Sequence, residues 1–234
     1  ERDNEATIQF GRMAADAVKG VPGVKFVNRI DSSWIFEKSA RTEMQDVINL
    51  WVVGRGSHDH LPDEVRLLRE KGQEVWFYCG AGPVAAPDRL ATLKWPWIAW
   101  GSESDGFTLW NGLGWGSWEQ VDRGMNHCLY PGERFGIRGP LASLRLKVLH
   151  RGMQDHAYLS LLTRQAGSRG AADAVIGDTI GCRGREDWYQ RGDGEEVSGT
   201  EIHTTSKTGK PWNTAPWRAW NAARAGLAHA VETK

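Results

Sequence analysis

The sequence predicts an α/β protein whose strands form a parallel sheet. Its best-defined part is the stretch from Asp46 to Gly80, DVINLWVVGRGSHDHLPDEVRLLREKGQEVWFYCG, which has the pattern of a strand, a helix and a second strand. The run 47–53 is apolar at nearly every position, which is typical of a strand buried on both faces. The run 74–79 has the same character, and parallel strands this close in sequence need a right-handed crossover helix between them. Strands and helices alternate on both sides of this stretch, which also indicates the α/β class.

The elements up to Gly80 follow from apolar spacing and from residues that begin or end helices. A helix is expected from Ala6 to Lys19, and a short strand at 24–30 comes before a helical piece around 38–44. A polar, glycine-containing loop follows the strand at 47–53. The crossover helix then begins at Pro62, with two acidic residues in its first turn, and ends at Lys71 and Gly72.

The elements after Gly80 are one more strand and three further helices. We expect a helix over 87–100 that is broken by Pro96, and a strand over 105–111 that leads into a glycine-rich segment. A long helix is expected over 138–166, opening with Gly139 and Pro140, and its apolar residues on more than one side require several packing partners.

The C-terminal part divides into an irregular segment and a closing helix. Residues 167–212 are rich in Gly, Arg, Asp, Ser and Thr and lack apolar periodicity, which indicates an irregular insertion and leaves open a hairpin or a partner-binding loop. Residues 215–231 form an amphipathic helix. The expected organisation is therefore a barrel-like part at 1–166, the insertion at 167–212, and a closing helix of the same domain at 213–234.

Composition excludes some classes of partner. The chain has 234 residues with 29 basic and 29 acidic side chains, and this balance argues against nucleic acid or an anionic membrane surface as the main partner. Thirteen Trp residues indicate either a heavily aromatic core or stacking platforms for sugar rings.

The three Cys residues have no metal-ligand or disulfide spacing. No membrane span or signal peptide is visible; because the chain starts without Met, a signal could have been removed, and a secreted or periplasmic location is slightly favoured.

Four stretches together resemble the C-terminal part of glycoside hydrolase family 123, whose characterised members are β-N-acetylgalactosaminidases. They occur in the family's order and are INLWVVG, KGQEVWFYCG, DGFTLWN and RFGIRGPLASLRLKVLHRGMQDHAYLSLL. The resemblance covers most of residues 1–166 and implies the second half of a (β/α)8 barrel, with the active site at the carboxyl ends of the strands and no cofactor. It also implies retaining hydrolysis in which the acetamido oxygen of the substrate attacks the anomeric carbon.

The family pattern also bears on the first residue. Its catalytic Asp and Glu are consecutive before the helix that corresponds to the one beginning near Ala6, so Glu1 falls near the position of the general acid. The Asp would precede the chain, and Arg2 stands where the family has Pro. Glu1 is either the acid or a terminal residue without a role. Half a barrel would leave bare sheet edges, so we expect a missing N-terminal segment or a second chain to complete it.

Side chains that follow strands are the candidate sugar-binding residues, because functional residues of a parallel barrel lie there. Arg55, His58 and His60 follow the strand at 47–53 and are either sugar ligands or part of a solvated loop; no third ligand accompanies the two His residues, so no metal site is predicted. Tyr78 ends the next strand and either binds the acetamido group or is a core residue.

The last visible strand supplies the other candidates. Trp110 and Asn111 end this strand, and Trp115 lies in the following segment, where an indole could form the floor of a sugar subsite. Asp155 lies on a packed helix and is expected to pair with an Arg such as Arg151, which is a structural role.

Two functions remain open at this point. One is a glycosidase piece acting on β-linked N-acetylhexosamine, specifically N-acetylgalactosamine. The alternative is a non-catalytic structural or carbohydrate-binding subunit with the same scaffold.

Overall fold

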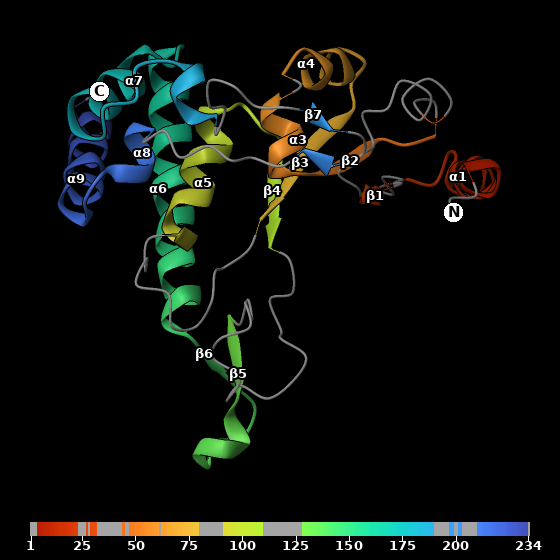
Figure 1. The fold of residues 1–234 in the computed structure, drawn as a ribbon, viewed down its shortest axis with the longest axis horizontal. Coiled ribbons are helices and arrows are strands. Elements are labelled where there is room, and N and C mark those ends of the chain that lie inside the picture. Colours follow the sequence, from red (N-terminus) through yellow and green to blue (C-terminus); the bar gives the residue numbers. More distant parts are fainter. Residues whose placement is uncertain are drawn as a thin grey trace. The chain divides into compact units, whose positions relative to one another are not determined.

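The chain forms two compact units in the computed structural model (Figure 1). The first consists of residues 1–78 and 190–206, and the second of residues 79–189 and 207–234. Each unit has its own buried apolar side chains. The structure describes residues 4–22, 27, 29–31, 44, 47–60, 62–79, 91–109, 128–189, 197–198, 201–202 and 210–233.

The first unit contains three strands that pair in parallel, which confirms the predicted α/β class. Its strands, in order across the sheet, are β1 (Arg29–Asp31), β2 (Leu50–Gly54) and β3 (Glu74–Cys79). The register places Leu50 opposite Glu74 at one end of β2, and Gly54 opposite Tyr78 at the other. The carboxyl ends of β2 and β3 therefore lie at the same edge of the sheet.

The two longer strands differ in burial. Every residue of β2 is buried, as its continuous apolar run predicts. In β3, Val75, Phe77 and Cys79 are buried, whereas Glu74, Trp76 and Tyr78 are only partly covered. The expectation that β3 would be buried on both faces is therefore wrong, because its alternate side chains reach a more open face.

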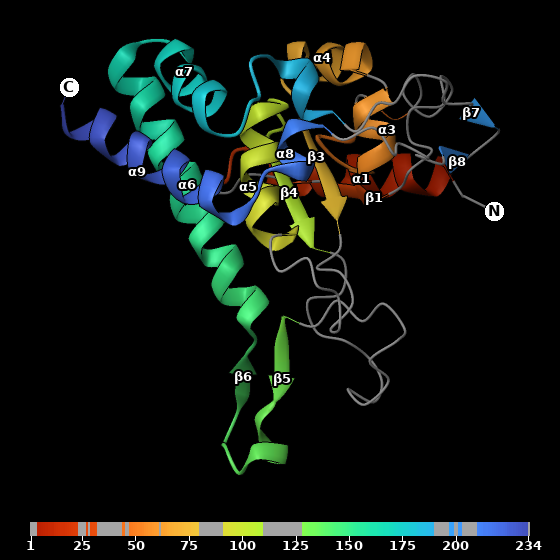
Figure 2. The ribbon, with the colours of Figure 1, turned by 60° about the vertical axis from the view of Figure 1, so that its left-hand side comes forward.

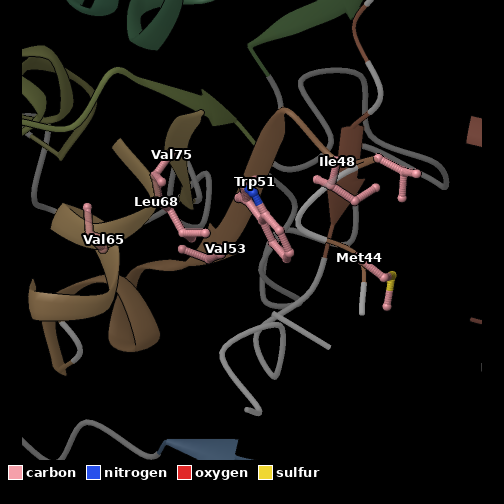
Figure 3. Close-up of a cluster of buried hydrophobic side chains, with 8 residues drawn as sticks. Met44, Ile48, Trp51, Val53, Val65, Leu68 and Val75 are labelled. Carbon is pink, nitrogen blue, oxygen red and sulfur yellow. The ribbon is translucent and has the colours of Figure 1, made fainter. Parts of the chain in front are cut away.

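A cluster of buried apolar side chains joins the sheet to the helix α4 (Pro62–Glu70) (Figure 3). Ile8 of α1 (Asn4–Val18) packs against this cluster. Trp51 at its centre is fully buried and donates its indole N–H to Gln73 Oε1 over 2.7 Å, so the ring is held without an unsatisfied polar group. The members of the cluster are Met44, Val47, Ile48, Trp51, Val53, Val65, Leu68 and Val75.

The helices of the first unit agree with the sequence in two places and correct it in a third. α1 and α4 form where they were predicted, and Gly72 follows α4 with a φ of 78°, a conformation that favours glycine. The expected loop after β2 is instead a short helix, α3 (Arg55–His60). It has no apolar stripe, but Arg55 and Asp59 form an ion pair at helical spacing that stabilises this turn.

The second unit is mainly helical. Its longest helix is α6 (Leu144–Ala166), which packs against α5 (Ala91–Gly101), α7 (Gly170–Thr179) and α9 (Trp217–Glu232) (Figures 1 and 2). This confirms that the long helix needs several partners. The other elements that the structure describes in this unit are β4 (Gly106–Leu109), β5 (Leu129–Pro131), η1 (Gly132–Phe135), β6 (Pro140–Ala142), η2 (Arg185–Trp188) and α8 (Pro211–Thr214).

Close packing between α5 and α6 depends on Gly152. A Cβ at this position would lie 2.6 Å from the Leu93 carbonyl oxygen and 3.1 Å from the ring of Pro96. α5 also contacts α9 through the rings of Trp97 and Trp220, whose centroids lie 5.3 Å apart at an angle of 80°.

Two expected boundaries in this unit are wrong. α5 runs unbroken through Pro96, and Gly152 of α6 packs close to this proline. α6 begins at Leu144 and not at 138, because Ser143 caps it: the Ser143 hydroxyl accepts a hydrogen bond from the Leu146 N–H over 3.2 Å. Residues 140–142 instead form β6, which pairs antiparallel with β5 (Figure 2).

The segment 167–212 is more regular than its composition predicts. It contains α7, η2 and the start of α8, together with the short antiparallel pair β7 (Val197–Ser198) and β8 (Glu201–Ile202). The closing helix forms as α9, with Trp220, Ala223 and Leu227 buried. Within the described ranges, no helix has the length and apolar character needed to cross a membrane.

Candidate functional site

The candidate site of the first unit lies at the carboxyl ends of β2 and β3. α3 begins at Arg55 directly after β2 ends at Gly54. The polar side chains of the site therefore lie on a helix that follows the strand without a loop. Arg55 is 7% exposed, and His58 and Asp59 are fully buried. Burying charged and imidazole groups costs free energy unless they are paired. The hydrogen-bond partners of these side chains therefore determine their role.

Asp59 is the centre of this polar group. Arg55 donates from Nε to Asp59 Oδ2 over 2.7 Å, and His58 Nδ1 lies 3.3 Å from Asp59 Oδ1. Each carboxylate oxygen therefore has its own partner, and the arrangement neutralises the negative charge inside the protein.

Phe77 of β3 forms the apolar wall of the group. The His58 ring meets the Phe77 ring edge-on, with centroids 5.4 Å apart at 64°, and the Arg55 guanidinium lies 4.6 Å from the centroid of the same ring. These contacts fasten α3 to the adjacent strand, since a guanidinium over an aromatic face is attracted by the ring.

The structure brings three predicted site residues to this edge. Arg55 and His58 are joined through Asp59, and Tyr78 lies opposite Gly54, which directly precedes Arg55. Tyr78 is partly exposed, so it is the more open of the three. His60 ends α3, and its side chain lies outside the described residues.

The other predicted site residues lie outside the part of the chain that the structure describes. They are Glu1, Trp110, Asn111 and Trp115. Their roles stay predictions. Among the residues that are described, no three His, Cys, Asp or Glu side chains are grouped so that they could hold a metal ion.

No protein-family model matches the chain, and no curated protein is significantly similar to it.

Sequence reasoning missed the role of Phe77 and treated the segment after β2 as a loop. The two-residue period of a strand carries the missing signal, because it places Phe77 on the same face as Val75, and that face is buried. The spacing of four between Arg55 and Asp59 is the signal for α3.

Asp155 has the structural role that its sequence position predicts. It is fully buried in the second unit, where it accepts hydrogen bonds from Arg224 and from Trp97 Nε1, and Arg151 Nε lies 4.0 Å from it. Burial raises the pKa of the Asp155 carboxyl above its ordinary value, although these three partners favour its ionised form.

Proposed function

We propose that the chain is the C-terminal half of a (β/α)8 glycosidase barrel that acts on β-linked N-acetylhexosamine, with N-acetylgalactosamine as the sugar. The observation that carries the proposal is the position of Arg55, His58 and Tyr78 at the shared carboxyl edge of two parallel strands. Sugar sites of parallel barrels are built at this edge. The sequence resemblance to glycoside hydrolase family 123 supplies the reaction class.

In this proposal Tyr78 contacts the sugar. The buried group of Arg55, His58 and Asp59 holds α3 in place at the end of β2. The Tyr78 side chain is partly exposed, and in the proposal its hydroxyl donates a hydrogen bond to the acetamido group of a bound sugar. Arg55 and His58 are buried, and through Asp59 they hold α3 against Phe77. His60, Trp110, Asn111 and Trp115 are the further proposed sugar contacts.

The proposed reaction retains the anomeric configuration. The acetamido oxygen attacks the anomeric carbon and forms an oxazolinium ring, while Glu1 gives a proton to the departing glycosidic oxygen. Water, deprotonated by the same carboxylate, then opens the ring and restores the acetamido group. The Asp that orients the acetamido group comes from the segment or chain that completes the barrel.

Completion by further polypeptide is part of the proposal, because a closed barrel leaves no bare sheet edge.

The test is release of the aryl group from an aryl β-N-acetylgalactosaminide by the complete protein. An aryl β-galactoside, which lacks the acetamido group, should not be cleaved, because the proposed nucleophile is then missing. Glu1→Gln should abolish release, whereas Glu5→Gln, a change at an exposed position in α1, should not. Absence of release from the complete protein, or equal cleavage of both substrates, would contradict the proposal.

A second candidate function is a non-catalytic carbohydrate-binding or structural subunit with the same scaffold. The observation that favours it is the state of Asp59, a carboxylate at the strand edge that is fully buried and bonded to Arg55. A carboxylate held in this way cannot reach a glycosidic oxygen. Binding of N-acetylgalactosamine without turnover, weakened by Tyr78→Phe, would establish this function instead.

A further inference from the structure

A cavity on the second unit, remote in sequence from β2 and β3, has the properties of a binding site. Its volume is about 340 Å³, and it lies where α6 and α9 pack together. This size falls within the range of small-molecule pockets. Its lining consists of Gln154, Ala157, Tyr158, Leu161 and Arg224.

The Arg224 guanidinium is held in a fixed position at this cavity. It donates to the carboxylate of Asp155 and, from Nη2 over 3.1 Å, to Gln154 Oε1. Its guanidinium carbon lies 5.6 Å from the centroid of the Tyr158 ring. A guanidinium has five N–H donors, so these contacts leave donors for a ligand, and the side chain is 30% exposed.

The charges beneath the cavity favour an anion. Asp155 is completely buried, and it faces two guanidinium groups, those of Arg224 and Arg151. The third neighbour of this carboxylate, Trp97, is neutral and donates from its indole nitrogen. Two guanidinium groups therefore share one buried carboxylate, which leaves this group of three with a net positive charge.

The rest of the lining consists of hydrogen-bond donors and apolar surface. The Gln154 oxygen accepts from Arg224, so its amide nitrogen remains to donate. Tyr158 adds a hydroxyl, and Ala157 and Leu161 add an apolar surface.

We propose that this cavity binds a small organic carboxylate. The carboxylate meets the Arg224 fork, which matches two coplanar oxygens, and the Tyr158 hydroxyl donates to the same group. The apolar body of the ligand lies on Ala157 and Leu161. Asp155 acts as a positioning residue that fixes Arg224 from below.

The experiment titrates benzoate and its neutral analogue benzamide into the full chain and follows binding by calorimetry. Benzoate is expected to bind at least about tenfold more tightly than benzamide, because hydrogen bonds to a charged group are the stronger ones. Added salt should weaken benzoate binding, since the site is partly exposed.

Four variants locate the site. Arg224→Lys keeps the charge next to Asp155 but loses the planar fork, and Tyr158→Phe removes one hydroxyl; each should weaken benzoate binding about tenfold. Leu161→Trp should fill the cavity and abolish binding. Arg164→Lys, an exposed change on the same helix, should leave binding unchanged. Thermal unfolding of each variant checks that it is folded.

Three outcomes would overturn the proposal. They are no saturable benzoate binding, equal affinity for benzamide, and unchanged benzoate affinity in both Leu161→Trp and Tyr158→Phe. Because Tyr158→Phe changes a single atom, it remains informative if the larger substitution unfolds the protein.

Discussion

Arg224 on α9 donates a hydrogen bond to the carboxylate of Asp155 on α6, and that carboxylate is completely buried. The two residues are 69 positions apart in sequence, so their pairing fastens the closing helix to the longest helix of the second unit. Arg151 extends the contact: it donates to Asn221 of α9 over 2.6 Å, and its guanidinium lies 4.5 Å from the centroid of the Trp217 ring.

Removing Arg224 should strongly destabilise the second unit. Arg224→Met keeps an apolar stem but leaves the buried Asp155 without its nearest cation, so we expect a loss of about 3 kcal/mol in the free energy of unfolding, measured with urea. The matched control is Arg66→Met, which breaks a 3.2 Å pair with Asp63 on the exposed surface of α4 and should cost less than about 1 kcal/mol. Equal losses in the two variants would refute a stabilising role for the buried pair.

Acid should weaken the second unit through His156. Burial lowers the pKa of His156 below its ordinary value of 6.5, so the folded state keeps the imidazole neutral where the unfolded chain binds a proton. The corresponding stability is present above pH 6.5 and is lost as the pH falls through the lowered pKa. Urea unfolding at several pH values should show a smaller acid-dependent loss in His156→Gln, but no such change in His150→Gln, which alters an exposed residue of the same helix. Identical pH profiles for His156→Gln and the unchanged protein would contradict this expectation.

Gly152→Ala should lower the melting temperature. The added Cβ would lie 2.6 Å from the Leu93 carbonyl oxygen, so α5 and α6 must separate, at a cost of about 1–3 kcal/mol. Gly170→Ala is the control, because its Cβ would meet no atom closer than Ser168 Oγ at 3.7 Å. Calorimetric melting of both variants tests the contact, and a Gly152→Ala protein as stable as the parent would show that the helices separate without cost.

Cys182 should resist alkylation until the protein unfolds. Burial, followed by the nearby Asp187 charge, raises the pKa of the Cys182 thiol to about 12, and the thiolate is the form that reacts. Iodoacetamide at neutral pH should therefore leave the peptide containing Cys182 unmodified in the folded protein and modify it in urea, as read by mass spectrometry. Rapid modification without denaturant would show that this region opens on its own.

The sequence by itself determined the α/β class and most of the helices and strands of the first unit. Its strongest signals are local: the apolar run that becomes β2, the proline that begins α4 and the glycine that follows it. Such signals act through backbone propensity and burial pattern within a few residues, so they can be read without knowing the neighbours.

Only the tertiary structure decided the features that depend on distant partners. Gly152 of α6 packs close to α5 beside Pro96, 56 positions earlier in the chain, and Phe77 of β3 packs against Arg55 and His58 of α3. Arg224 reaches Asp155 in the same way. These contacts join residues that no local pattern relates, since the free energy that favours them comes from packing and charge pairing in the folded chain.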